Sequence, residues 1–210
     1  MTDRSYNFVS SNPRTMSKGE QTRQMIIAQS APIFNKKGIA ATSMSDIMDA
    51  TKLSKGSLYV HFDNKDVLAE AVVDYNMERL ENKIITALGK SEHPKEKLFA
   101  YLDAFKNPFN SPVPGGCPML NFGMEADDQN EAVLEKVAAL VNKSQQLLTD
   151  VMANGIRQGV FKPDWNYKEF ATMMFAMIEG GILITNTTRK MDKMLIINRN
   201  LKKMIEAQLC

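Results

Sequence analysis

Positively charged and hydrogen-bonding side chains gather in one short segment of this 210-residue chain. Lys55 supplies a charge, and three hydrogen-bonding side chains follow it: Ser57, Tyr59 and His61. Groups of these types at such spacing bind phosphate oxygens and base edges. Gly56 stands among them, although a glycine inside a helix costs about 1 kcal/mol relative to alanine. Close approach to another backbone would explain that glycine, so the segment predicts a nucleic-acid site.

Two short capped helices must hold these side chains in place. Ser43 can cap the first helix, and Asp46, three residues later, can reach back toward the cap. Ser54 can cap the second helix, which carries residues 55–61. Two short helices separated by three or four residues outline a helix-turn-helix. We therefore expect one at about residues 43–61.

Four local features stand together in residues 22–70: the helix end at Phe34 to Gly38, the Thr42-Ser43 cap, the run Leu58-Tyr59-Val60-His61-Phe62 and the restart at Asn64-Lys65-Asp66. Through them this part of the chain, about a quarter of its length, resembles the DNA-binding domain of the TetR family of transcriptional regulators. It departs from the family at Lys52, where such domains often carry glycine in the turn, and a left-handed conformation would cost lysine more.

The resemblance implies a role for each matching position. The start of the first short helix should contact phosphate, the start of the second should meet bases or nearby phosphates, and later positions should bind the DNA backbone. The DNA-binding residues implied are Thr42, Ser43, Lys55, Gly56, Ser57, Tyr59, His61 and Lys65.

Helical periodicity continues through the rest of the chain, and strand signals are almost absent, so we expect an all-α fold. The domains expected are a flexible arm at 1–17, a three-helix DNA-binding domain at 18–64 and a helical domain at 65–210 for effector binding and dimerisation. A long helix from residue 65 should connect the two domains. Four prolines within 107–118 predict a loop.

Composition sets further bounds. Residues 1–60 carry eight Lys/Arg against four Asp/Glu, whereas the remainder carries 18 against 20, so positive charge gathers where a polyanion would bind. A basic terminal segment is also common without function. Two cysteines give no disulfide framework. With neither a secretory signal nor a membrane span predicted, we expect a cytoplasmic protein.

The resemblance also implies a homodimer formed by the last two helices. Helices at 167–188 and 192–209 have broad apolar faces, which two subunits could share in an isologous interface or one protomer could bury in its own core. The predicted interface residues are Met174, Ile178, Gly181, Ile182, Thr185, Ile197, Leu201 and Met204.

Family members usually enclose a small-molecule effector in the second domain. Methionine adapts to varied ligands, although ordinary core packing explains any one of these residues equally well. Glu125, if buried, would need a partner or a cationic ligand. The predicted effector-binding residues are Phe105, Met119, Phe122, Glu125, Met152, Trp165, Met173 and Met177.

These features together predict a repressor that binds palindromic operator DNA as a homodimer and is released by an effector. A DNA-binding protein without an effector pocket is one alternative, and a helical enzyme is another. The chain lacks the usual hydrolase, metal and nucleotide motifs, so we expect no catalytic residue, metal or cofactor. Cys117, just before a predicted helix, is either a reactive thiol or a small apolar residue.

Overall fold

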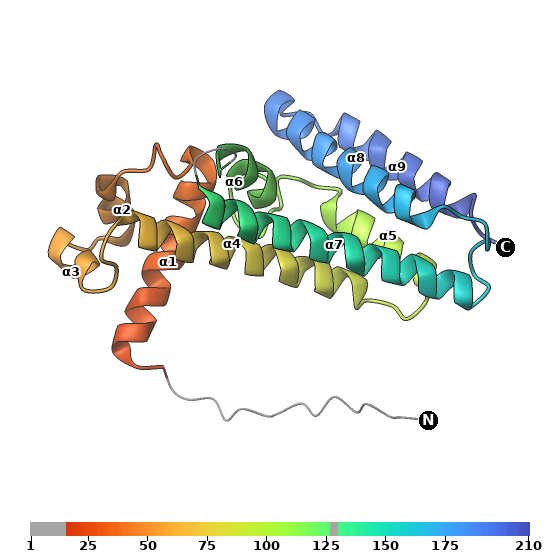
Figure 1. Cartoon of the computed structure of the whole chain (residues 1–210). Helices are drawn as coiled ribbons and strands as arrows, with labels where there is room; N and C mark the ends of the chain where they lie inside the picture. Colours follow the sequence, from red (N-terminus) through yellow and green to blue (C-terminus); the bar gives the residue numbers. More distant parts are fainter. Residues whose placement is uncertain (1–15, 127–129) are drawn as a thin grey trace, which may run out of the picture.

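The described residues of the chain, 16–126 and 130–210 of a computed structural model, form nine α-helices (Figure 1). The all-α fold predicted from the sequence is confirmed. Of the arm expected at 1–17, only residues 16 and 17 are within the described part. The helices are α1 (Lys18–Lys37), α2 (Met44–Thr51), α3 (Lys55–Tyr59), α4 (Lys65–Leu88), α5 (Pro94–Phe105), α6 (Pro118–Ala126), α7 (Glu131–Arg157), α8 (Tyr167–Thr188) and α9 (Asp192–Glu206).

Local sequence sets where the first four helices begin. Each helix follows a capping residue whose side chain accepts a hydrogen bond from the backbone N–H three residues later. This bond satisfies a donor that the helix itself leaves free. At Ser43 the contact is reciprocal, because the Asp46 carboxylate accepts the Ser43 N–H at 2.9 Å. The capping residues are Ser17, Ser43, Ser54 and Asn64.

The N-terminal domain consists of α1, α2 and α3, packed around a small core. Its buried side chains include Phe34 from α1, Ile47 from α2 and Leu58 from α3. Helix α1 packs against both α2 and the first part of α4. Helix α4 then leads away from this domain into the second one, so a single helix connects the two (Figure 1).

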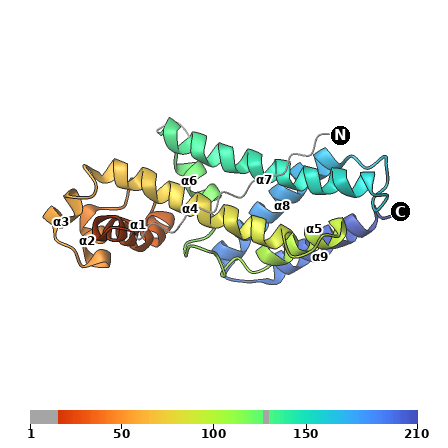
Figure 2. The same ribbon diagram turned by 90° about the horizontal axis from the view of Figure 1, so that it is seen from below.

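The C-terminal domain is a bundle of the remaining helices along α4 (Figure 2). Helices α5 and α7 pack against α4, α8 packs between α7 and α9, and α9 also contacts α5. The Asn198 amide on α9 donates to the Leu102 carbonyl on α5 at 2.8 Å, which ties the last helix to the core. Helix α6 lies near the N-terminal domain and contacts α1.

Helix α8 is long and apolar enough to cross a membrane by length and composition alone, with a mean hydropathy of 1.2 over 18 residues. One face of it is core, since Phe170, Met174 and Ile178 are buried inside the protomer. Glu179 lies on the same helix. An ionisable residue and a protein-packed face are typical of a core helix rather than a membrane span.

Candidate nucleic-acid interface and effector cavity

The turn between α2 and α3 sets their relative angle. It begins at Lys52, which adopts the left-handed conformation with φ 57° and ψ 24° and donates its N–H to the Met48 carbonyl at 2.9 Å. The left-handed conformation costs an L-residue about 1–2 kcal/mol. Lysine thus occupies a left-handed position in this turn that glycine would adopt at lower cost.

The outer face of α3 carries Lys55, Gly56 and Tyr59, all of which are exposed. Tyr59 is 40% exposed, and the Lys55 ammonium lies 5.9 Å from the centre of its ring. A Cβ atom added to Gly56 would meet no atom within 4 Å, so packing within this chain does not require a glycine there. An open glycine on a polar, cationic face fits close approach by a second backbone, such as that of DNA.

The inner face of α3 anchors it to the domain. Leu58 and Phe62 are buried, and the Arg23 guanidinium of α1 lies 4.6 Å from the centre of the Phe62 ring. The α-helix ends at Tyr59, and the N–H groups of His61 and Phe62 both donate to the Leu58 carbonyl at 3.0 Å. His61 is therefore half-buried in a turn that continues the helix.

The other implied DNA contacts on α2 and α3 differ in exposure. Ser43 is exposed, and Ser57 is half-buried. Thr42 is only 1% exposed, and its hydroxyl donates to the Gly38 carbonyl at 2.6 Å. The Thr42 side chain therefore braces the turn between α1 and α2, and a phosphate contact from Thr42 stays a prediction.

Lys65 also contacts the protein itself. Its half-buried ammonium donates to the carbonyls of Ile39 at 3.0 Å and Ala40 at 3.3 Å. The charge implied for DNA binding thus lies against backbone carbonyls of the turn after α1. A phosphate contact from Lys65 remains a prediction.

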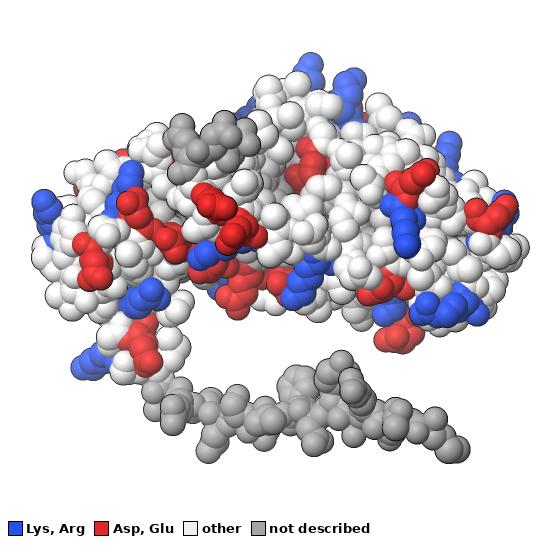
Figure 3. Space-filling view, viewed as in Figure 1, with Lys and Arg blue, Asp and Glu red and all other residues white. Residues whose placement is uncertain are grey.

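The sequence analysis missed Val60, which is 79% exposed at the end of α3. An exposed apolar side chain beside a polar face can contact a thymine methyl group in the major groove. In the view of Figure 3, basic and acidic residues are interspersed among the described residues of the N-terminal domain. The positive charge on this side of the domain is therefore scattered among acidic residues rather than gathered in a broad patch.

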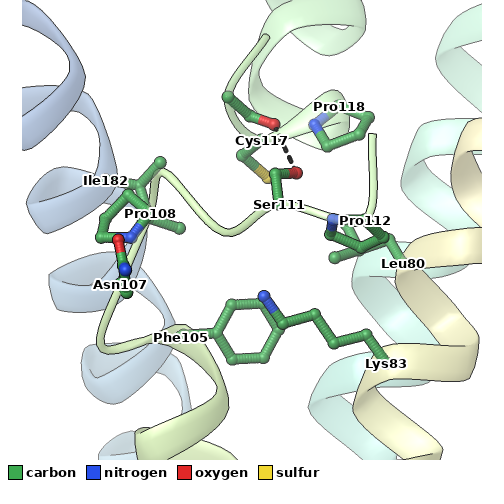
Figure 4. A pocket seen from close by; sticks show the side chains of 11 residues that line it. Leu80, Lys83, Phe105, Asn107, Pro108, Ser111, Pro112, Cys117, Pro118 and Ile182 are labelled. Atoms are coloured by element: carbon green, nitrogen blue, oxygen red, sulfur yellow. Dashed lines mark hydrogen bonds between the residues drawn. The ribbon is translucent and has the colours of Figure 1, made fainter. Parts of the chain in front are cut away.

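A small cavity lies between α4, α5 and the segment that leads to α6 (Figure 4). Lys83 and Phe105 line one side, and Cys117 and Pro118 line the other. The Lys83 ammonium lies 4.8 Å from the centre of the Phe105 ring, and burial lowers its pKa. The cavity measures about 20 Å³, enough for about one water molecule and far below an ordinary ligand pocket.

The predicted effector residues do not share one pocket. Phe105 lines the cavity, but Trp165 packs between the rings of Phe161 and Phe170, with centroids 4.9 and 5.1 Å away. Met173 is 38% exposed on α8. Met119, Phe122 and Met152 are buried, and Met177 is half-buried. Core packing, the plainer interpretation, therefore accounts for most of them.

Glu125 has a different role from the one expected. It is half-buried near the end of α6, and its carboxylate accepts the backbone N–H groups of Ile39 and Ala40, each at 2.7 Å. These donors satisfy the charge, so no cationic ligand is needed. Nothing in its sequence neighbourhood indicates this contact, because the partners lie about 85 residues earlier.

Cys117 is buried beside a carboxyl group. Its Sγ lies 3.4 Å from Glu179 Oε1. Burial, followed by the negative charge of Glu179, raises the pKa of the thiol well above its usual value, despite backbone N–H groups of α6 that act in the opposite direction. The thiol is therefore protonated, and the structure supports the small apolar interpretation of Cys117 rather than the reactive one.

Most of the residues predicted for the dimer interface are used within the protomer. A Cβ atom added to Gly181 would lie 2.5 Å from the Met194 sulfur, so this glycine lets α9 approach α8. Ile197 and Met204 are half-buried against the same core. The buried members of the predicted interface pack inside the protomer, so their place in a dimer interface stays a prediction that this packing does not favour: Met174, Ile178, Gly181, Ile182, Thr185 and Leu201.

Another face of α8 packs against none of the residues that the structure describes. Leu183 is 54% exposed, and Gly180 has no atom within 4 Å of an added Cβ. On α9, Leu195 and Ile196 are exposed as well. We call these residues the outer stripe, which consists of Met173, Ala176, Gly180, Leu183 and Ile184 on α8 with Leu195 and Ile196 on α9.

The fold and the outer face of α3 define a two-domain, all-helical protein with an N-terminal helix-turn-helix. Residues 26–72 match the family described as bacterial regulatory proteins, tetR family, and residues 94–199 match the tetracyclin repressor-like C-terminal domain. The chain belongs to the TetR family of helix-turn-helix transcriptional regulators.

Solved structures and curated relatives agree with this assignment. A TetR transcriptional regulator from Chloroflexus aurantiacus is 32% identical, with a TM-score of 0.88 over 92% of this chain and 98% of that one. A TetR-family regulator from Cytophaga hutchinsonii is 34% identical, with a TM-score of 0.86 over 93% and 98% of the two chains. The regulator TtgR of Pseudomonas putida is 25% identical over 174 residues, which covers 80% of this chain and 82% of TtgR.

Proposed function

We propose that this protein represses transcription as a cytoplasmic homodimer that places α3 of each protomer in the major groove of a palindromic operator. The observation that carries the proposal is the outer face of α3, where Lys55 and Tyr59 flank an open Gly56. A recognition helix contacts base edges with the residues near its N-terminus, and Lys55 and Gly56 are its first two residues.

The outer stripe supplies the two-fold contact that this function requires. Exposed apolar side chains that lie together are unfavourable in water. The same face of a second copy would bury them in a two-fold interface. The proposal thereby explains why α8 is apolar on both of its faces. Two α3 helices related by such an axis read half-sites about 34–36 Å apart.

A small-molecule effector would act by favouring a second conformation of the C-terminal domain. A ligand shifts the equilibrium between two conformations only if it binds them with different affinities. The cavity beside Phe105 and Cys117 is the place we propose for it. That cavity must widen to admit a ligand larger than water. The second candidate is a DNA-binding regulator without an effector, which the small size of this one cavity favours, whereas an apolar hollow of about 310 Å³ lined by Leu88, Pro94 and Leu147 does not.

Selection of bound duplexes from a random-sequence library by the purified protein tests the proposal. We expect the selected sequences to contain two inverted half-sites separated by about one helical turn. Recovery of unrelated sequences at low ionic strength, or of a single half-site, would overturn the dimeric repressor. To test for an effector, operator affinity is measured in the presence of each member of a panel of apolar and cationic small molecules. A change in affinity supports an effector that widens the cavity, and no change with any of them favours the second candidate.

A further inference from the structure

The backbone turn between α1 and α2 is held by a residue of the C-terminal domain. Glu125 on α6 accepts the N–H of Ile39 through Oε2 and that of Ala40 through Oε1, each at 2.7 Å. Hydrogen bonds to an ionised acceptor are shorter and about twice as strong as those between neutral groups. One carboxylate therefore fixes two consecutive peptide groups of the N-terminal domain.

The same two residues are held at their carbonyls. Lys65, in the first turn of α4, donates to the carbonyls of Ile39 and Ala40 at 3.0 and 3.3 Å. All four backbone polar groups of this dipeptide thus contact either the carboxylate or the ammonium. We call the arrangement of Glu125, Lys65, Ile39 and Ala40 the turn clamp.

The clamp needs the chain to pass very close to Glu125. Gly38 has φ 84°, and a Cβ atom there would lie 2.7–2.9 Å from the carboxylate atoms. The Thr42 hydroxyl then bonds back to the Gly38 carbonyl, and Ser43 caps α2 directly afterwards. The position of the clamped turn therefore determines where α2, and with it the helix-turn-helix, begins.

A second contact joins α6 to α1 itself. The Asn121 amide on α6 donates to the backbone carbonyl of Asn35 on α1 at 2.8 Å and to its side-chain oxygen at 3.0 Å. Asn35 is buried and donates in turn to the carbonyl of Pro114 at 3.2 Å. Helix α6 thus holds the last turn of α1 through Asn121 and the turn after α1 through Glu125, one turn of α6 further on.

Helix α6 also borders the cavity, because Cys117 and Pro118 line it and Pro118 is the first residue of α6. The helix therefore runs from the cavity wall at one end to the turn clamp at the other. Any change that moves α6 changes the place where the helix-turn-helix is held.

We infer that Glu125 is a positioning residue for DNA recognition, which fixes the orientation of the helix-turn-helix relative to the dimer axis through the backbone of Ile39 and Ala40. The inference rests on the proposed function. A dimer that binds two half-sites must hold its two α3 helices at a fixed separation. If the helix-turn-helix of either protomer can pivot, a smaller fraction of the dimers has that separation. A single half-site makes no such demand.

The test compares Glu125→Ala and Glu125→Gln in the full-length protein by fluorescence anisotropy. The probes are a duplex selected by the wild-type protein and the same duplex with one half-site scrambled. We expect Glu125→Ala to lower affinity for the intact duplex about tenfold and to change affinity for the scrambled duplex less than about twofold. Glu125→Gln removes the same charge but keeps an oxygen acceptor, so it should recover part of the loss.

Met124→Ala is the matched control, because this neighbour on α6 is 73% exposed. Amide exchange gives a readout that does not depend on DNA: Glu125→Ala should speed exchange at Ile39 and Ala40 and leave the core of α4 unchanged. Equal DNA binding by Glu125→Ala and Met124→Ala, or equal losses on both duplexes, would overturn the inference while leaving the proposed function standing. Absence of DNA binding by the wild-type protein would overturn both.

Discussion

Gly180 and Gly181 are neighbours in α8 but point in different directions, about 100° apart around the helix axis. Gly181 lies against Met194 of α9, where a Cβ atom would collide, whereas Gly180 faces open space. One glycine thus serves packing within the protomer, and its neighbour belongs to the outer stripe. The two faces of α8 therefore have separate tasks, which can be tested separately.

Leu183→Asp is expected to abolish self-association. The substitution places a charge in the middle of the outer stripe, where a second copy would have to desolvate it. Light scattering coupled to size-exclusion chromatography should give a dimer for the wild-type protein and a monomer for the variant. Met124→Asp, an equally polar change on an exposed residue of α6, should remain dimeric. A dimeric Leu183→Asp protein would place the interface elsewhere.

Lys52→Gly is expected to stabilise the protein by about 1 kcal/mol, because glycine adopts the left-handed conformation of this turn without the cost that lysine bears. The free energy of unfolding in denaturant, measured at one fixed protein concentration, gives the comparison. Lys106→Gly is the control. Lys106 ends α5 with φ −58°, so glycine relieves nothing there and should destabilise the protein. A loss of stability in Lys52→Gly would contradict the strain argument.

Glu179→Gln is expected to be more stable than the wild-type protein at neutral pH. Burial raises the pKa of Glu179 above its usual 4.5, so the folded protein holds this proton more tightly than the unfolded chain. The resulting stabilisation is complete below pH 4.5 and is lost as the pH rises through the folded pKa.

The melting temperature measured from pH 4.5 upward checks this. The difference between Glu179→Gln and wild type should grow with pH and reach a few degrees, since about 1 kcal/mol corresponds to roughly 2–4 °C for a chain of this size. Glu169→Gln, at an exposed position of the same helix, should show no such trend. A constant difference across the pH range would mean that Glu179 does not bind its proton more tightly on folding.

The elements that sequence predicts well are those set by local chemistry. Ser43 and Ser54 cap helices where expected, because an N-cap is decided by a side chain and an N–H three residues away. Gly38 ends α1 for a similarly local reason. The outer face of α3 follows from the same short segment.

Contacts between distant segments escaped prediction. Glu125 was expected to bind an effector, and Lys65 was expected to bind DNA. Both side chains bind the turn at Ile39 and Ala40, which no local pattern indicates. Helix α8 is apolar on both faces, so periodicity alone could not decide which face packs inside the protomer. The residues predicted for the dimer interface lie mostly on the buried face, and no signal in the sequence singled out the outer stripe.

The central claim is that DNA binds the outer face of α3, and a salt series tests it most directly. The binding constant for a selected duplex is measured against ionic strength for the wild-type protein, Lys55→Ala and Tyr59→Ala, with Lys90→Ala at the far end of α4 as control. We predict a steep salt dependence for the wild type, weaker binding by both α3 variants, and a slope shallower by about 1 per protomer for Lys55→Ala. If Lys55→Ala and Tyr59→Ala bound as tightly as Lys90→Ala at every salt concentration, α3 would not be the DNA-binding element.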